Sequence, residues 1–304
     1  MDESEKTTTQ KPRKGFPFTL VRHIVQACAL ILFAIPVLAA GWRLFGQTVG
    51  GDNALATPAQ LPLFGTFSSS SLFGITILDP FAALEVIAAS KSFTLDLLIG
   101  ALPVLIVYGL IRGRAFCGWV CPVNFLMEGI DWLRQKLNIK VEERVMPRHV
   151  KVYVAAGVLV LSALLGFPLF EAISPLSIIN KGLVLGSMVG LITLLAIVLV
   201  ELFWGHRVWC RGICPLGGFY EVLGKIGMAN VRIDHSACIG CGKCKKACLC
   251  DPEILNEAVA GTDCIVRAGD CMACGKCVES CPTGALALKF GRPAKQAAST
   301  EENA

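Results

Sequence analysis

Two runs of cysteines near the end of the 304-residue chain have the spacing C-x2-C-x2-C-x3-C. They are Cys238, Cys241, Cys244 and Cys248, followed by Cys271, Cys274, Cys277 and Cys281. Three thiolates on a tight loop can reach three irons of one cubane, and in two-cluster ferredoxins the fourth cysteine of each run ligates the other cluster. The runs therefore predict two [4Fe–4S] clusters. The first is expected on Cys238, Cys241, Cys244 and Cys281, and the second on Cys271, Cys274, Cys277 and Cys248.

A pair of zinc sites is the alternative interpretation, because zinc also accepts four cysteines. Zinc sites do not usually repeat a whole set of cysteines at this spacing, so clusters are favoured. Cys248 is not followed by proline, and Cys250 lies two residues further on. Either thiol could be the exchanged ligand, and the spacing favours Cys248. Cys264 fits neither run, and we interpret it as an ordinary loop thiol.

Four more cysteines reveal an internal duplication. The segment Cys117-x3-Cys121-Pro122 recurs 93 residues later as Cys210-x3-Cys214-Pro215, and the same register relates Glu128 to Glu221. Residues four apart share one face of a helix, so the thiols of each pair can converge, and proline is tolerated where a helix begins. We expect a redox or metal role for Cys117, Cys121, Cys210 and Cys214, and a third site if the two pairs meet. The alternative is that they only pack helix ends.

The elements that must position these cysteines are predicted to be membrane helices. Charged residues make up only 17% of the chain, and a helix of about 20 mostly apolar residues can cross a bilayer. Four stretches qualify: Ile24 to Trp42, Ser92 to Ile111, Val152 to Phe170, and Gly182 to Val200. The predicted fold is a membrane all-α domain of four transmembrane helices in two repeated hairpins, followed by a small α+β two-cluster ferredoxin-like domain. A fifth apolar region, Asn53 to Leu78, is broken by proline, glycine and serine and is interpreted as a loop or interfacial segment.

The placement of Lys and Arg predicts that both termini are cytoplasmic, in a bacterial inner membrane. The expected domains are a cytoplasmic tail (1–22), the transmembrane domain (23–206), and the cytoplasmic cluster domain with its tail (207–304). On that reducing side, the 15 cysteines favour metal or redox chemistry over disulfides. The net charge of +5 requires no nucleic acid, because basic residues beside membrane spans are attracted to anionic lipid.

Along almost its whole length, the chain resembles the NapH-type ferredoxin subunit of periplasmic nitrate reductase systems. The resemblance rests on both C-x3-C-P segments, on Pro147-Arg148-His149, on Ile173 to Ser177, and on Asp270-Cys271-Met272-Ala273-Cys274-Gly275. It implies an electron-transfer subunit of a quinol dehydrogenase. The implied partners are the membrane quinol pool, a periplasmic iron–sulfur protein of NapG type, and a membrane-anchored multihaem cytochrome.

Two further residues are candidates for accepting the proton of a quinol. Glu201 follows the fourth apolar stretch, where an ionisable side chain is a functional candidate. His149 is placed at the head of the third and could serve with a suitable pKa. Each could instead be an interface anchor.

Two other functions remain open at this stage. In a copper-reducing assembly factor, the C-x3-C-P thiols would bind Cu(I), which soft thiolates favour. In a redox-sensing accessory protein of another respiratory oxidoreductase, the clusters would report redox state. Similar ferredoxins serve methylamine use, nitrous oxide reduction and copper handling, so the pathway is less specific than the chemistry.

Overall fold

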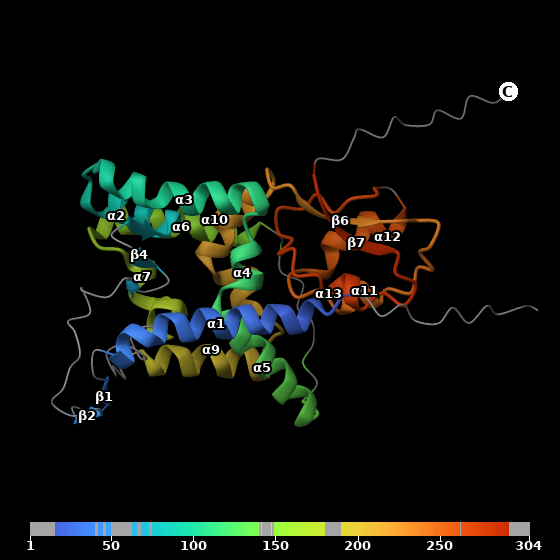
Figure 1. The fold of residues 1–304 in the computed structure, drawn as a ribbon, viewed down its shortest axis with the longest axis horizontal. Helices are drawn as coiled ribbons and strands as arrows, with labels where there is room; N and C mark the ends of the chain where they lie inside the picture. The colour runs from blue at the N-terminus through green and yellow to red at the C-terminus, as the bar shows by residue number, and fades with distance from the viewer. Residues whose placement is uncertain are drawn as a thin grey trace, which may run out of the picture.

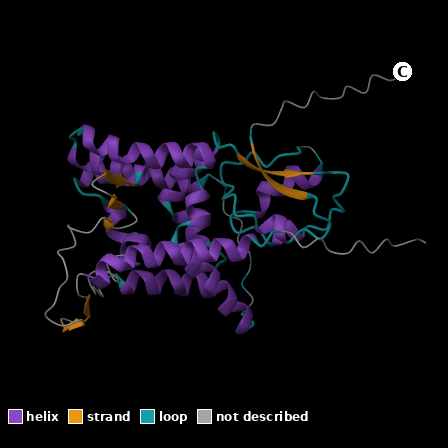
Figure 2. Cartoon of the chain, viewed as in Figure 1, coloured by secondary structure: helices purple, strands orange, loops and turns teal. Residues whose placement is uncertain are grey.

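The computed structural model describes residues 16–39, 42–44, 47–49, 63–65, 68–72, 75–139, 141, 147, 149–179, 190–261 and 263–291. The described residues form two adjoining parts. Figure 1 shows the long helices gathered at the left and the small C-terminal part, with β6 and β7, at the right. Helices dominate the larger part, and short strands and loops make up most of the smaller one (Figure 2).

The helical part contains two series of elements that follow the duplication in the sequence. The first series is α1 (Phe18–Ala39), α2 (Pro80–Ser90), α3 (Leu95–Ile111), α4 (Ala115–Trp119) and α5 (Pro122–Lys136). The second is α6 (Val150–Leu165), α7 (Leu169–Ile173), α9 (Leu191–Phe203), the π-helix η2 (Trp209–Ile213) and α10 (Pro215–Gly224). Pro122 and Pro215 each occupy the first turn of a helix, where a missing N–H costs nothing.

Between α1 and α2 the described segments are short antiparallel strands. β1 (Trp42–Leu44) pairs with β2 (Gln47–Val49), and β4 (Ser69–Leu72) lies between β3 (Leu63–Gly65) and β5 (Ile75–Leu78). Asp79 caps the start of helix α2, and its carboxylate accepts the Ala82 N–H at 3.2 Å. This is the usual way to satisfy an N–H at a helix start.

The smaller part is built around one two-stranded antiparallel sheet, in which β6 (Ala229–Ile233) pairs with β7 (Leu286–Phe290). Short helices fill the segment between them: α11 (Lys243–Lys246), η3 (Pro252–Leu255), α12 (Asn256–Ala260) and α13 (Lys276–Glu279). Gly242 and Gly275 immediately precede α11 and α13 with φ of +67° and +73°. Glycine adopts this left-handed conformation without the steric cost of a Cβ.

The core of the helical part is aromatic. Phe81 and Tyr220 are fully buried and both contact Phe219, while Phe116 packs against Tyr220. The two series also interlock, since α5 packs on α9 and α10 packs on α3 as well as on α6. Each series therefore completes the core of the other.

Arg112, which directly follows α3, joins the helical part to the smaller part. Arg112 is 1% exposed, and its guanidinium donates to the carbonyl oxygens of Ala229 and Val266 at 3.0 Å and of Cys271 at 3.3 Å. Carbonyls that bind a charged donor in a low-dielectric interior form strong hydrogen bonds. The smaller part is therefore anchored through its own backbone, close to the second cysteine run.

The prediction of four transmembrane helices is wrong. Among the residues that the structure describes, no helix combines the length and the apolar character that crossing a membrane requires. The helices within three of the four stretches, α3, α6 and α9, have 17, 16 and 13 residues. The apolar runs overestimated them because they also counted loop residues, such as those around Gly166, where α6 ends with φ of +74°.

The first apolar stretch contributes α1, which begins at Phe18, before the predicted domain boundary at residue 23. Its first turns hold Arg22 and Gln26, both fully buried against protein. The predicted cytoplasmic placement of both termini depends on the same four spans and loses its basis with them. Residues 1–15 and 292–304 lie outside the described residues. Residues 63–78 of the fifth apolar region contribute strands β3, β4 and β5.

Gly218 is the residue where α10 comes closest to α6. A Cβ at Gly218 would lie 2.1 Å from the Lys151 carbonyl oxygen, whereas a Cβ at Gly157, within α6, would meet nothing within 4 Å. We predict that Gly218→Ala lowers the free energy of unfolding by about 1–3 kcal/mol, because backbone must move to admit the methyl group. Gly157→Ala should raise it by about 0.5–1 kcal/mol through helix propensity. Denaturant unfolding measures both, and equal effects would contradict the close approach.

Candidate cluster-binding site

The first cavity in the smaller part is lined by cysteines from both runs. Its thiols are Cys238, Cys241, Cys244 and Cys281, the set that the exchange of fourth ligands predicts. Gly240 and Gly242, with φ of +65° and +67°, also line the cavity, and such turns aim backbone N–H groups inward. The loop can therefore surround an anionic cluster closely.

The smaller part contains a second cavity. It is lined by Cys248, Cys250, Cys271, Cys274 and Cys277, with the apolar side chains of Val231, Ile254, Leu255, Val266 and Met272 around them. Burial raises the pKa of Cys274 and Cys277, and in Cys277 the neighbouring Cys274 raises it further. Thiols crowded in an apolar cavity are poorly suited to remain free thiolates, but bonds to iron neutralise their charge. The donor set fits a cubane in each cavity.

Cys248 and Cys250 differ in what their sulfurs contact. The Sγ of Cys250 accepts from Arg114 Nη1 at 2.7 Å and donates to the Asp270 carbonyl oxygen at 3.0 Å. The Sγ of Cys248 has a weaker contact, 3.2 Å from the Asp251 carbonyl oxygen. The thiol of Cys250 is therefore already held by partners other than a cluster.

The four cysteines of the duplicated motif line a third, almost wholly apolar cavity. Cys117 lies within α4 and Cys210 within the π-helix η2, while Cys121 and Cys214 are the residues that precede α5 and α10. The structure thus brings both C-x3-C-P pairs together around one space, as the symmetry of the repeat predicts. π-helical turns are often found at functional sites.

The electrostatics of the third cavity disfavour free thiolates. Burial raises the pKa of Cys121, and the nearby Cys117 and Cys214 raise it further. Burial likewise raises the pKa of Cys214 to about 12, helped by Cys117. Like charges in a low-dielectric space cannot all ionise without a cation between them. Cysteine is the residue type that soft metals and iron–sulfur centres favour.

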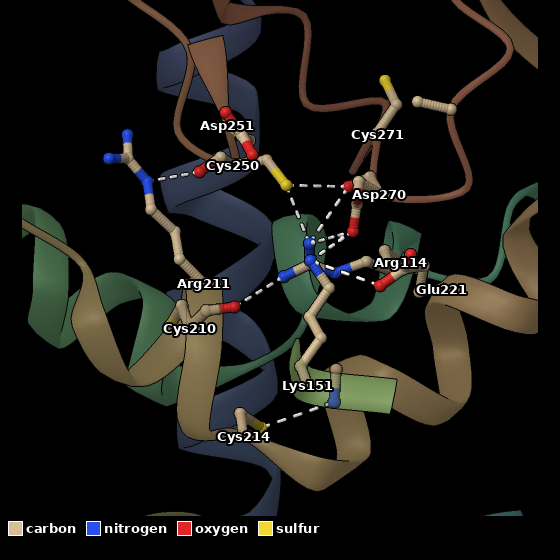
Figure 3. A network of polar contacts seen from close by, with 12 residues as sticks. Arg114, Lys151, Cys210, Arg211, Cys214, Glu221, Cys250, Asp251, Asp270 and Cys271 are labelled. Carbon is tan, nitrogen blue, oxygen red and sulfur yellow. Dashed lines mark hydrogen bonds and ion pairs between the residues drawn. The ribbon is translucent and has the colours of Figure 1, made fainter. Parts of the chain in front are cut away.

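Arg114 connects the third cavity to the second one. Its Nη2 donates to the Cys210 carbonyl oxygen at 3.0 Å, and its Nη1 reaches both Cys250 and Asp270 (Figure 3). Burial would lower its pKa, but the surrounding cysteines and Asp270 raise it, so the guanidinium keeps its charge. A fixed positive charge therefore stands between the two cavities.

The loop of the second cysteine run packs directly on the first C-x3-C-P motif. Met272 lines both the second and the third cavity. A Cβ at Gly118 would lie 3.0 Å from the Met272 carbonyl oxygen, and the Trp119 indole N–H donates to the Ala273 carbonyl at 3.0 Å. The two cavities are therefore neighbours that share a wall.

Three other sequence candidates lie outside these cavities. Glu201 is buried and accepts the Trp209 N–H at 2.7 Å, so it caps the π-helix. His149 precedes α6, and its Nδ1 lies 2.8 Å from Glu221 Oε1. Cys264 lines none of the three cavities.

Sequence reasoning did not single out Arg114, Met272 or Asp270. Arg114 lies within the repeat, Asp270 directly precedes the second cysteine run and Met272 lies inside that run, so their positions carried a signal. Position in the sequence could not reveal which residue each side chain contacts. The described residues contain no group of three or more His, Cys, Asp or Glu placed closely enough for one metal ion. Cubane ligands need not be so close, because each thiolate binds a different iron.

Comparison with known proteins points to the same chemistry. Residues 93–140 and 187–233, which hold the two C-x3-C-P motifs, match a model described as a 4Fe-4S binding domain, and residues 265–287 match a second model of that description. The chain is 35% identical to the methylamine utilization ferredoxin-type protein MauN of Methylorubrum extorquens over 88% of its own length and 87% of the relative.

Two more relatives are similarly close. Identity to MauN of Paracoccus denitrificans is 33% over 83% of this chain and 82% of that protein. Identity to the ferredoxin-type protein NapH of Escherichia coli is 34% over 65% of this chain and 69% of that protein. No solved structure matches the chain.

The contacts of Arg114 predict a large stability effect. Arg114→Met should lower the free energy of unfolding by about 3 kcal/mol, because Asp270 loses one of its buried cationic partners. Arg267→Met is the matched control: Arg267 is 68% exposed and pairs with Asp263 within one helical turn's spacing, so a change below about 1 kcal/mol is expected. Denaturant unfolding measures both variants. A similarly small change in the free energy of unfolding in both would show that Arg114 contributes little to stability.

Proposed function

Because the chain belongs to the family of ferredoxin-type proteins that includes NapH and MauN, and is thus a 4Fe–4S electron-transfer protein, we propose that it passes electrons from quinol to two clusters through its adjoining cysteine-lined cavities. The observation that carries this proposal is the wall shared by the second and third cavities at Met272. An electron at the C-x3-C-P thiols would have a short, packed route to the second cluster. In this role the chain is an electron-transfer subunit of a quinol dehydrogenase.

The proposed ligands follow the linings of the two cavities in the smaller part. Cys238, Cys241, Cys244 and Cys281 hold the first cluster, and Cys271, Cys274, Cys277 and Cys248 hold the second. Cys248 is preferred over Cys250 because the sulfur of Cys250 is engaged by Arg114. The clusters supply one-electron chemistry, while the protein supplies thiolates, backbone N–H groups and an apolar surround.

The third cavity is proposed to be a further redox or metal site. Cys117, Cys121, Cys210 and Cys214 converge there, and an iron–sulfur centre is favoured by the 4Fe-4S description of the two matched segments. Cu(I) is the second candidate, because soft thiolates select it. Measurement of the bound metal distinguishes an iron–sulfur centre from a Cu(I) site.

The proposed partners and pathway are supported by the resemblance to NapH-type proteins. A NapG-type iron–sulfur protein and a multihaem cytochrome are the proposed partners. The resemblance to NapH-type proteins favours periplasmic nitrate reduction as the pathway, and methylamine utilization is the alternative, from the name of the MauN relatives. Glu201 and His149 stay predicted proton acceptors. Of the two, His149 is partly solvent-exposed, with 59% of its side chain accessible.

Contact with membrane lipid is also proposed, on the basis of exposed apolar side chains. Leu102, Leu164 and Ile192, from α3, α6 and α9, are 55%, 76% and 78% exposed. Exposed apolar side chains that gather into one patch mark an interaction site. Flotation with liposomes tests this proposal. Replacement of Leu164 and Ile192 by lysine should weaken binding of the protein to the liposomes.

Iron content tests the cluster ligands. Protein purified without oxygen should hold about eight irons in the smaller part, as two cubanes require, and Cys274→Ser should remove about four. Cys248→Ser should have the same effect, whereas Cys250→Ser should leave both clusters assembled. The opposite result for the last two variants would identify Cys250 as the ligand, and zinc in place of iron would end the cluster interpretation.

The third cavity has its own test. Cys121→Ser and Cys214→Ser should abolish reduction of the clusters by quinol while chemical reduction by dithionite stays normal. Cys28→Ser is the control, because Cys28 is exposed on α1 and away from all three cavities. Wild-type quinol turnover in both cavity variants would leave these thiols with a packing role.

A further inference from the structure

A cluster of buried ionisable side chains lies beside the second cavity, where α10 packs on α6. Glu221 and Lys151 are each 2% exposed, and Asp270 is fully buried. Lys151 Nζ lies 3.4 Å from Glu221 Oε2 and forms an ion pair with Asp270 Oδ1. Figure 3 shows these side chains grouped next to Arg114. Burying this many charges is costly unless they are paired or serve a function.

One carboxylate oxygen of Glu221 faces the exposed His149, and the other faces the buried Lys151. Its Oε1 lies 2.8 Å from Nδ1 of His149, whose side chain is 59% exposed. Its Oε2 is buried and accepts no hydrogen bond among the described residues. The geometry thus provides a place for one proton and a path by which it can arrive.

We propose that Glu221 is a proton-binding site linked to the second cluster, which takes up one proton through His149 when one electron enters the second cavity. The inference rests on the proposed function, since it requires a cluster in that cavity. The electron comes from the quinol proposed above, or from dithionite in the test. The proton comes from water and binds a Glu221 carboxylate oxygen, so the charge of the region is unchanged.

The charges around Glu221 support uptake at this carboxyl. Burial raises its pKa, and the nearby Asp270 raises it further, against the opposing effect of Lys151. Asp270 already forms ion pairs with both Arg114 and Lys151. Glu221 is therefore the acid of this pair that is ready to accept a proton.

The other elements packed around Glu221 supply the remaining charged and titratable groups. His149 and Lys151 come from the start of α6, and Asp270 comes from the loop ahead of the second cysteine run, with Arg114 beyond it. Lys225 lies one turn further along from Glu221. Helix α3 brings the phenol of Tyr108 against Tyr220, the residue before Glu221.

An added electron would favour the proton by simple electrostatics. Asp270 directly precedes Cys271, so the acid pair is adjacent to the second cavity, and added negative charge raises the pKa of a nearby acid. By linkage, the reduction potential must then fall as the pH rises, because the reduced state binds more protons.

The duplication provides a control at the equivalent position. Glu128 is the counterpart of Glu221 and also contacts a histidine, with His23 Nε2 at 3.0 Å. Burial would raise its pKa, but Arg22, whose Nη2 donates to it at 2.6 Å, holds the pKa below the usual range. Glu128 is therefore expected to remain a carboxylate whatever the state of the cluster.

The test is a redox titration of the whole protein, prepared without oxygen, at several pH values between 6 and 8. The second cluster is recognised as the signal lost in Cys274→Ser. We expect its potential to fall with rising pH, with an upper limit of about 59 mV for each tenfold change in proton concentration in a one-electron couple. In Glu221→Gln the potential should be independent of pH, and in Glu128→Gln the wild-type slope should persist.

Infrared difference spectra, reduced minus oxidised, give a second reading on the wild-type protein. A carbonyl band of a protonated carboxyl should appear on reduction and be missing in Glu221→Gln. If that variant does not assemble its clusters, the wild-type spectrum decides, and absence of the band overturns the proposal. A flat wild-type potential, or an unchanged slope in an assembled Glu221→Gln protein, also overturns it. Absence of any cluster from the wild type would instead refute the proposed function.

Discussion

The insertion of two buried guanidinium groups into the C-terminal part is the interaction on which the remaining structure depends. Arg112 binds backbone carbonyls around β6 and the second cysteine run, and Arg114 binds Cys250, Asp270 and the backbone of Cys210. A guanidinium keeps its charge when buried and offers donors in several directions. One short segment after α3 therefore fixes both the docking of the cluster-binding part and the electrostatics between its second cavity and the third.

Duplication gave the chain two similar halves that have acquired different tasks. Arg114 and its counterpart Arg207 are both buried, but Arg207 pairs with Asp131 and Asn124 within the helical part, whereas Arg114 reaches out of it. Glu128 and Glu221 differ in the same way. The second half carries Glu221, the acid whose pKa burial raises, whereas in the first half Arg22 neutralises Glu128. The symmetric backbone thus supports an asymmetric distribution of charge.

Sequence patterns predicted which cysteines gather around a cavity far better than they predicted the long-range structure. The two cysteine runs and the 93-residue repeat give the sets of thiols that line three cavities, because spacing along a loop or helix directly limits which side chains can converge. Apolar runs did not give the helix lengths, since hydropathy counts Gly166 and Pro168 without registering that the helix has ended. Contacts such as that of Arg114 with Cys250 join residues 136 positions apart, and no local pattern encodes them.

The approach of Gly118 to Met272 sets the spacing between two proposed redox sites. With no side chain at position 118, the motif lies against the backbone of the loop that holds Cys271 and Cys274, and a Cβ would be 3.0 Å from the Met272 carbonyl oxygen. Electron transfer slows steeply as the gap between centres widens. A methyl group at this position would push the motif away from the loop, and it would slow electron transfer between the two proposed sites.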